Sequence, residues 1–283
     1  MSKKLIVGIG EILWDMLPSG KALGGAPANF AYHAKRLGME GLAVSAIGRD
    51  ALGEEIVETL EAHALPYHLD RVEYPTGTVQ VSLDAKGVPQ YDIKKGVAWD
   101  NIPYSKELAA IAAECRAVCF GSLAQRGMVS RKTIGWFLDA VPADCLKVFD
   151  INLRQSYYGK EVLKESLRRC DILKINDEEI RTVAALFGLE GDDATVCRRL
   201  IARYGLRLVI LTRGASGSEI ITADEVIPQA AGECVVVDTV GAGDAFTAAF
   251  VVAYLRGDTL AEAQRLASET AAYVCSCKGA MPE

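Results

Sequence analysis

Short apolar, β-branched segments alternate with longer amphipathic segments along most of this chain, and this alternation limits its possible folds more than any other feature. A short apolar run bounded by turn residues is typical of a buried strand, and apolar residues three or four positions apart are typical of a helix. Strands that alternate with helices form a mainly parallel sheet with helices on both faces. We therefore expect an α/β protein with a doubly wound sheet.

The same apolar pattern sets the expected boundaries. The expected strands cover residues 5–9, 41–47, 117–120, 147–150, 171–175, 206–211 and 234–237. The expected helices cover residues 27–36, 52–64, 105–113, 131–140, 161–169, 178–187, 194–204, 245–255 and 260–275. Helix 245–255 is almost wholly apolar, so we expect it to be buried and to end at Gly257.

Two stretches depart from this alternation. Residues 11–20 continue in extended form after the first strand, and residues 67–95 alternate between apolar and polar side chains around a turn at Asp84–Gly87. We interpret them as a small antiparallel sheet that forms a lid, although an edge hairpin packed on the core would give the same pattern. We expect one domain over residues 1–283, with lid segments at about 11–22 and 66–98.

Composition excludes several classes of function. The net charge is −6, which argues against an extended nucleic-acid surface. Charged residues interrupt every apolar run before it reaches the length of a membrane span, so no membrane partner is expected. The apolar N-terminal stretch is short and ends at Glu11, which favours a first strand over a signal peptide. We therefore expect a cytoplasmic protein.

Cysteine and histidine supply no obvious metal or acid–base site. The eight cysteines form no C-x-x-C pair, which favours buried reduced thiols over zinc ligands. The three histidines lie outside any motif. Carboxylates must therefore perform any acid–base chemistry.

The segment Asp238–Phe246 carries the most specific chemical signal. Its two glycines lie between an expected strand and the apolar helix, where backbone N–H groups and the helix dipole favour an anion. Asp244 lies in the first turn of that helix, beside the anion site. This arrangement suits phosphoryl transfer to a hydroxyl with an aspartate base, although a simple turn and a dipole partner would look the same.

Polar residues also follow the carboxyl ends of the expected strands, where ligands bind in open parallel sheets. These residues are Glu11, Asp15, Asp150, Asn152, Arg154, Asn176, Asp177, Glu178, Glu179, Thr212, Arg213, Gly214, Gly217, Asp238 and Thr239. Carboxylates, amides, arginines and glycines are the groups that bind phosphate and magnesium.

Four motifs in order resemble the ribokinase-like (PfkB) family of carbohydrate kinases, and the resemblance extends along essentially the whole chain. They lie at residues 24–31, 48–53, 176–179 and 238–246. The resemblance implies a doubly wound sheet with a β-lid over a sugar, and an enzyme that uses ATP and Mg²⁺. It also implies a sugar as the small-molecule partner, and a homodimer that pairs through the lid.

The resemblance assigns roles residue by residue. Asp244 would be the base, and the anion hole would comprise Gly241, Ala242 and Gly243. The sugar would contact Asp15, Gly24, Gly25 and Asn29. Arg154 would bind a phosphate or the substrate, or else form a surface ion pair.

The nucleotide and its ions would occupy the neighbouring strand ends. The implied nucleotide-binding residues are Asn176, Thr212, Gly214, Gly217 and Gly243. Asn176 and Glu179 would hold Mg²⁺ through waters, while Asp238 and Thr239 would form a monovalent-cation site for K⁺ or would only cap the helix. Ser268 departs from the family, which often has an asparagine near the adenine.

The segment Gly24–Asn29 resembles the fructokinase branch, which implies a ketohexose and in particular fructose as the substrate. Ribose, 2-keto-3-deoxygluconate or a catalytically inactive sugar-binding relative stay open. A sugar phosphate would need basic residues near the lid, such as Lys94, Lys95 and Arg126. A dinucleotide-binding dehydrogenase is disfavoured because Leu13 replaces the third glycine of that fingerprint.

Overall fold

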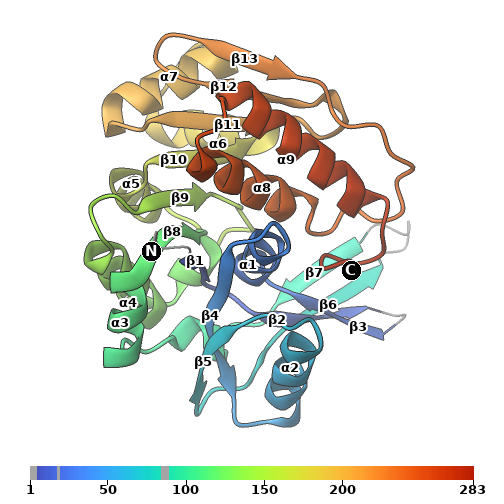
Figure 1. The fold of residues 1–283 in the computed structure, drawn as a ribbon. Coiled ribbons are helices and arrows are strands. Elements are labelled where there is room, and N and C mark those ends of the chain that lie inside the picture. The colour runs from blue at the N-terminus through green and yellow to red at the C-terminus, as the bar shows by residue number, and fades with distance from the viewer. Residues whose placement is uncertain (1–4, 18–19, 84–88) are drawn as a thin grey trace.

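The computed structural model describes residues 5–17, 20–83 and 89–283, and its main feature is a sheet of nine strands in the order β13-β12-β11-β10-β9-β8-β1-β4-β5 (Figure 1). The seven strands from β11 to β5 run parallel, and β12 runs antiparallel to both of its neighbours, β11 and β13. The strands of this sheet are β1 Leu5–Ile9, β4 Glu40–Gly48, β5 Tyr67–Val72, β8 Cys115–Phe120, β9 Leu146–Asp150, β10 Ile172–Asn176, β11 Leu208–Thr212, β12 Ser218–Ile221 and β13 Val226–Gln229.

Helices cover both faces of this sheet, as the alternation predicts. Their bounds are α1 Ala26–Arg36, α2 Ala51–Ala62, α3 Lys106–Glu114, α4 Met128–Ala140, α5 Lys160–Arg169, α6 Asp177–Phe187, α7 Asp193–Tyr204, α8 Ala242–Arg256 and α9 Leu260–Cys275. In β1, Val7 and Ile9 join the core under α3–α7, while Ile6 joins the core under α1, α8 and α9. Each such side chain contributes about 1.5–3 kcal/mol on burial, so the period of two holds the strand between both layers.

Helix α8 lies in the middle of one layer, packed against both α1 and α9 (Figure 1). Its residues from Ala245 to Ala253 are all buried, which explains why it has no polar face. Gly257 ends it in the left-handed conformation, with φ 92°, as expected from the sequence.

A second sheet of four strands, in the order β3-β2-β6-β7, confirms the smaller sheet expected from the sequence. Its strands are β2 Leu13–Leu17, β3 Gly20–Gly24, β6 Gly77–Leu83 and β7 Pro89–Ile93. It is mixed rather than antiparallel, because its two central strands β2 and β6 pair in parallel. Both leave the main sheet in the same direction, so only the hairpin partners β3 and β7 run back.

Part of the expected lid belongs to the main sheet. β5 pairs in parallel with β4, so the lid segment cannot begin at residue 66. The alternating pattern is alike in an edge strand and in a lid strand, since both have one covered face. The turn expected at Asp84–Gly87 lies outside the described residues.

The expected buried strand at residues 234–237 is wrong. These residues form no strand, and Val235 is 83% exposed. The edge of the sheet is instead formed by β12 and β13, which the sequence reading missed, and the N–H groups of Val237 and Asp238 both bond to the carbonyl of Cys275. An apolar β-branched run becomes a strand only if a partner strand is available to it.

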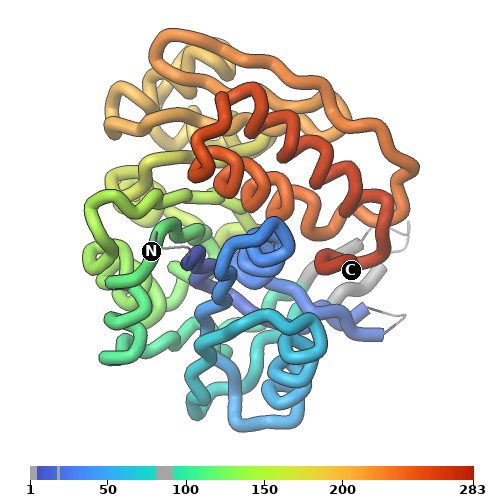
Figure 2. The backbone as a smooth tube through the Cα atoms, in the orientation of Figure 1, coloured from blue at the N-terminus to red at the C-terminus, as the bar shows by residue number. Residues whose placement is uncertain are grey.

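The C-terminal segment returns to α1, where the red end of the tube meets the blue helix in Figure 2. The Tyr32 hydroxyl donates to the carbonyl of Pro282 at 2.7 Å, and Nε2 of His33 lies 2.9 Å from the carbonyl of Ala280. The segment is thereby held close to the start of α8, where it contacts Gly241.

Five of the eight cysteines are buried free thiols, as expected, but Cys234 is exposed. Across residues 5–17, 20–83 and 89–283, no helix has both the length and the apolar character needed to cross a bilayer. In the same part of the chain, no three His, Cys, Asp or Glu side chains are grouped so that they could hold a metal ion.

Candidate active site

Asp244 lies in the first turn of α8, and the turn before it has the geometry that the glycine motif predicts. Gly241 precedes the helix in the left-handed conformation, with φ 80°. A Cβ atom at this position would lie 2.5 Å from the Cβ of Ala280, so both the backbone angle and the space require glycine. Gly243 is exposed and Asp244 is partly exposed, so the start of the helix is open to solvent, while the carboxyl group itself lies deeper.

The side chain of Asp244 is held by a residue distant in the sequence. Nδ2 of Asn29 donates to Oδ2 of Asp244 at 2.7 Å, which joins the start of α1 to the start of α8. Oδ1 of Asn29 is buried and has no partner in the described part of the chain. The structure therefore brings together the predicted base and a predicted sugar contact, and leaves an acceptor free beside them.

The surroundings of Asp244 favour its protonated form. Burial raises the pKa of this carboxyl, and the negative charge of Asp150 raises it further, to about 7. The hydrogen bond from Asn29 and the positive charges of Lys174 and Arg154 partly oppose this increase. A carboxylate with a pKa near neutrality is well suited to accept a proton from a hydroxyl.

A buried ion pair lies next to the start of α8 and is hydrogen-bonded to it. Nζ of Lys174 lies 3.1 Å from Oδ1 of Asp150 on the neighbouring strand, and the Thr247 hydroxyl donates to Oδ2 of Asp150 at 3.1 Å. Burial disfavours the charge of Lys174, but Asp150, Glu179 and Asp244 outweigh it and raise the pKa of this lysine. It therefore stays positive beside the predicted anion hole, where a Cβ at Gly243 would lie 3.2 Å from Nζ.

Sequence reasoning did not assign a role to Lys174 or Asp150. A signal existed, because Lys174 interrupts the apolar strand β10, and a fully buried lysine is rare unless it has a partner. The identity of that partner could not be found, since it depends on the alignment of Lys174 with Asp150 across the sheet.

The predicted sugar contacts Asp15, Gly24 and Gly25 lie together where β2 pairs with β3. A Cβ at Gly24 would lie 2.6 Å from Oδ2 of Asp15, so the glycine leaves room for this carboxylate. Gly25 precedes α1 with φ 124°, and a Cβ there would lie 2.4 Å from the carbonyl of Glu11. Burial raises the pKa of Asp15, and the charge of Arg154 opposes that effect.

Arg154 is exposed, on the loop after β9, and its Nη1 donates to the carbonyl of Leu153 at 3.2 Å. Its positive charge also lowers the pKa of Asp15, Glu11 and Asp244 against other influences that raise it. Arg154 therefore lies within electrostatic range of three carboxyl groups, and its role in binding a phosphate or the substrate stays a prediction.

Glu11 joins this group, although sequence reasoning gave it no role. Its side chain is 2% exposed, and Oε2 has no partner in the described part of the chain. Burial raises its pKa to about 7 against the effect of its own backbone N–H, and the charges of Asp244 and Asp150 contribute to the increase. Glu11 follows β1, and the sequence indicates only that it is a polar residue after a strand.

Asn176 and Glu179, the predicted magnesium residues, form a capping box at the start of α6. Oδ1 of Asn176 accepts from the N–H groups of Glu178 and Glu179, and Oε2 of Glu179 accepts from the N–H of Asn176 at 3.0 Å. Oε1 of Glu179 also accepts from the N–H of Leu153 at 2.8 Å. These bonds orient both side chains without using all the lone pairs of their oxygens.

Thr212 lies beside Asn176 in the sheet, so two predicted nucleotide-binding residues share one edge. Gly214 and Gly217 flank the short turn between β11 and β12, with φ values of 53° and 96°. A Cβ at Gly217 would lie 2.1 Å from the carbonyl of Gln229, so the turn itself requires this glycine. Their use by a nucleotide therefore stays a prediction.

Asp238 accepts backbone hydrogen bonds from two separate segments. Its Oδ1 accepts from the N–H of Val240 at 3.0 Å, and its Oδ2 accepts from the N–H of Gly279 at 3.1 Å. Thr239 is exposed, and its carbonyl accepts from the N–H of Ala242 at 3.3 Å. Ser268 is buried in α9, and its carbonyl faces the loop at Gly232.

Two cavities in the described part of the chain lie outside this group of residues. One of about 420 Å³ lies between α4 and α5 and is lined by Trp136 and Glu165, among others. The other, of about 330 Å³, lies between α1 and α9 beside Tyr273. The site is therefore identified by its side chains and their electrostatics rather than by cavity volume.

Known proteins are similar to this chain over nearly its whole length. A family model described as pfkB family carbohydrate kinase matches residues 19–283. The chain is 29% identical to an ATP-dependent 6-phosphofructokinase of Thermoanaerobacterium thermosaccharolyticum, over 98% of this chain and 89% of that protein. It is 28% identical to a fructokinase of Rhizobium leguminosarum bv. trifolii, over 93% of this chain and 83% of that protein.

Solved structures of sugar kinases are also similar to this chain. The crystal structure of an uncharacterized sugar kinase from Pyrococcus horikoshii in complex with ATP matches with a TM-score of 0.82 at 29% identity, covering 98% of this chain and 94% of that one. The resemblance read from the motifs and the expected α/β fold with a smaller sheet are therefore both confirmed.

Proposed function

Because the chain belongs to the pfkB family of carbohydrate kinases, we propose that it transfers the γ-phosphate of ATP to a hydroxyl of a ketohexose, with fructose as the parent sugar. The observation that carries this proposal is the hydrogen bond between Asn29 and Asp244 at the start of α8. It unites an amide suited to a sugar hydroxyl with a carboxylate suited to remove a proton. The fructokinase relatives and the segment Gly24–Asn29 support fructose.

In the proposed reaction, the oxygen of the sugar hydroxyl bonds to the γ-phosphorus of ATP while the bond from this phosphorus to ADP breaks. Asp244 accepts the proton that the hydroxyl loses. Asn29 orients the carboxylate through Nδ2 and offers Oδ1 to a second hydroxyl. Asp15 accepts from further sugar hydroxyls, and the room beside Gly24 supports that role. The lid would exclude water from the reaction.

The start of α8 supports a role in stabilising the transferred phosphoryl group. Backbone N–H groups at a helix N-terminus carry partial positive charge, and Gly241 sets their direction through its left-handed conformation. Lys174 adds a full positive charge close to Gly243. Fixed donors of this kind stabilise developing negative charge more effectively than mobile water does.

Two ions complete the proposal. The oxygens of Asn176 and Glu179 fit a hydrated Mg²⁺, because hard cations prefer oxygen ligands and Mg²⁺ retains its waters. Bound Mg²⁺ would neutralise charge on the phosphates of ATP.

Asp238, with the backbone of Thr239, is proposed to hold K⁺. Activity that is unchanged when K⁺ is replaced by a bulky organic cation would contradict the proposed K⁺ site.

An ADP-release assay with fructose, ribose, fructose 6-phosphate and 2-keto-3-deoxygluconate tests the proposal. We expect turnover with a ketohexose, and a loss of about 10²–10⁴-fold in kcat for Asp244→Asn, since removing a general base costs this much. ATP binding, measured by calorimetry, should survive because the backbone donors remain.

Glu107→Gln is the matched control, since Glu107 is also an acid in a first helical turn but is exposed on α3. It should leave the rate unchanged. A near-native rate for Asp244→Asn would show that another group is the base. Sugar binding without turnover in the unmodified protein would identify a catalytically inactive sugar-binding relative.

A further inference from the structure

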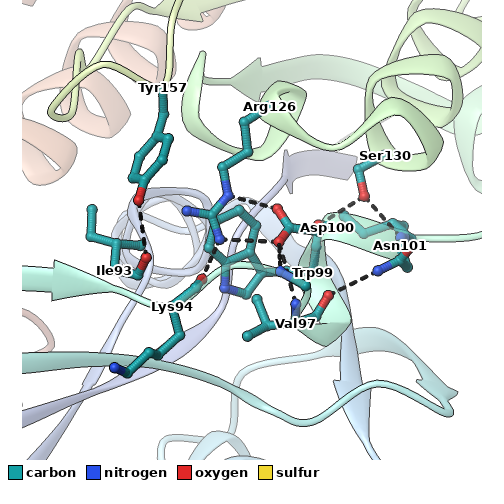
Figure 3. A network of polar contacts seen from close by, with 11 residues as sticks. Ile93, Lys94, Val97, Trp99, Asp100, Asn101, Arg126, Ser130 and Tyr157 are labelled. Atoms are coloured by element: carbon teal, nitrogen blue, oxygen red, sulfur yellow. Dashed lines mark hydrogen bonds and ion pairs between the residues drawn. The ribbon is translucent and has the colours of Figure 1, made fainter.

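Arg126 is a buried arginine at the end of the short helix η2 Leu123–Arg126, and the site described so far does not use it. Its side chain is 8% exposed. The guanidinium carbon lies 4.0 Å from the ring centre of Trp99 and 4.6 Å from that of Tyr157, so aromatic rings fix its position (Figure 3). A charged group placed this deeply needs partners for each of its donors.

Two of the three guanidinium nitrogens have such partners. Nε of Arg126 donates to Oδ1 of Asp100 at 2.7 Å, and Nη2 donates to Oδ2 of Asp100 at 3.0 Å and also to the carbonyl of Lys94 (Figure 3). Nη1 is buried and has no hydrogen-bond partner among the described residues. A buried unpaired donor is costly, and more so on a charged group, which indicates that a ligand supplies the missing acceptor.

The local charge is positive in spite of Asp100. Nζ of Lys95 lies 5.1 Å from the centre of the same Tyr157 ring, so two cations share this ring. Asp100 is the ion-pair partner of Arg126, and its Oδ2 also accepts from the N–H groups of Gly96 and Val97. Lys95 therefore adds a positive charge that the carboxylate of Asp100 does not balance, while Lys94 is paired with Asp92.

Arg126, Lys95, Trp99 and Tyr157 form a cluster that lies close to the predicted sugar contacts. Tyr157 lies on the loop that carries Arg154, and its hydroxyl donates to the carbonyl of Ile93 at the end of β7 (Figure 3). Trp99 lies against the start of β6, where a Cβ at Gly77 would be 2.2 Å from its Nε1. Gly77 pairs with Leu13, two residues before Asp15. The cluster thus lies at the base of the small sheet, next to the segments that carry the predicted substrate contacts Asp15 and Arg154.

We propose that Nη1 of Arg126, together with Nζ of Lys95, binds an anionic group on the sugar at the end away from Asp244. The group is a phosphate ester or a carboxylate, both of which accept charge-assisted hydrogen bonds from a single guanidinium nitrogen and from an ammonium group. This proposal rests on the proposed kinase function and narrows its substrate from a neutral ketohexose to one with a charged terminus. The proposed base, Asp244, is the same in both cases.

The test compares neutral and anionic acceptors in three proteins. The unmodified protein should use fructose 6-phosphate or 2-keto-3-deoxygluconate at least about tenfold better in kcat/KM than fructose, because only the anionic acceptors form a charge-assisted hydrogen bond with Nη1. Arg126→Lys keeps a positive charge opposite Asp100 but lacks Nη1. It should lower kcat/KM about 10–100-fold for the preferred anionic acceptor and much less for fructose.

Lys95→Met provides a second variant that does not threaten folding, since Lys95 is exposed. It should also weaken the anionic acceptor selectively. Arg131→Lys is the control, because Arg131 pairs with Glu165 on the solvent side of α4, and it should change neither substrate. Preference for the phosphate ester or for the sugar acid identifies which anion the site takes.

Calorimetric binding of fructose 6-phosphate to the unmodified protein and to both variants gives a readout that does not require turnover. Binding weakened in both variants, with fructose binding retained, supports the anion site. No preference for anionic sugars, or equal loss for fructose and fructose 6-phosphate, overturns it while the kinase function stands. Absence of ADP release with every acceptor would instead overturn the proposed function, and the binding comparison would still decide the anion site.

Discussion

At the scale of single residues, the proposed base must lose a proton in surroundings that favour the protonated form. Burial and the charge of Asp150 raise the pKa of Asp244 to about 7, although Asn29 and Lys174 oppose them. Glu11 has a pKa of about 7 for the same main reason, burial. Two carboxyl groups near the proposed reaction centre therefore titrate close to neutrality, and only one of them is expected to control the rate.

We predict that the pH profile of kcat/KM has a rising limb near pH 7, since Asp244 acts as a base only when ionised. Its folded-state pKa lies above the ordinary value of 3.8, so the folded protein binds the proton more tightly than the unfolded chain. Stability from this group is therefore present at low pH and is lost as the pH rises from about 4 to about 7.

Rate profiles and chemical denaturation at several pH values measure both effects. Asp244→Asn should gain stability relative to the unmodified protein at high pH more than at low pH. Glu11→Gln should retain the limb in its rate profile. If the limb disappears in Glu11→Gln, the titration belongs to Glu11, and a profile that is flat across neutrality contradicts the assignment altogether.

Individual site residues were predictable only where the sequence itself carries them in a motif. Asp244 and Asn29 were found from two such segments, and the structure joins them at 2.7 Å. Lys174 and Asp150 were missed as a pair because neither has a local signature. Their partnership exists only when β9 and β10 align in the sheet.

At the scale of elements, the start of α8 illustrates how one glycine can serve both fold and function. Gly241 and Gly257 flank the helix, and both adopt the left-handed conformation. A Cβ at Gly241 would meet Ala280, whereas no atom lies within 4 Å of a Cβ at Gly257. The two positions thus share the left-handed backbone conformation and differ in their surroundings.

We predict that Gly241→Ala lowers kcat by more than about tenfold and raises the KM for ATP, because displaced backbone donors lose about 10²–10³-fold in comparable sites. Gly257→Ala should cost about 1–2 kcal/mol of stability from its left-handed angle and leave the kinetics unchanged. Kinetic assays and denaturation curves on both variants separate the effects. Equal kinetic losses would mean that helix stability, not donor geometry, matters.

Element predictions succeeded where periodicity was strong and failed where pairing decided the outcome. The helices follow their apolar spacing, and α6 and α9 also carry capping boxes that mark their starts. Residues 234–237 have the composition of a strand but remain exposed, and the N–H groups of Val237 and Asp238 bond to the carbonyl of Cys275 instead of to a strand. The four-residue strands β12 and β13 were too short to stand out from a loop.

At the scale of the whole molecule, the small sheet projects beside the start of α1 and forms one side of the predicted sugar contacts (Figure 1). Its base is joined to the main body by Arg126 and Tyr157, which bond to the carbonyls of Lys94 and Ile93. We propose that this sheet acts as a lid, which would exclude water and limit wasteful hydrolysis of ATP.

We predict that sugar together with a non-hydrolysable ATP analogue lowers the radius of gyration in solution scattering and protects amides of β2 and β6 from hydrogen exchange. Either ligand alone should produce a smaller change, since closure needs contacts from both sides. Scattering and exchange that stay the same with both ligands bound would argue against closure of the small sheet.

The alternation of strands and helices, the order of the family motifs and the proposed base can all be predicted from the amino-acid sequence, because they depend on local periodicity and on residues close together in the chain. Which distant groups meet depends on the packing of the folded chain: Asn29 meets Asp244, Lys174 meets Asp150, and Arg126 meets Asp100 with one nitrogen unpaired among the described residues. Burial sets the charge and the need for partners of such groups, and burial is a property of the packed molecule.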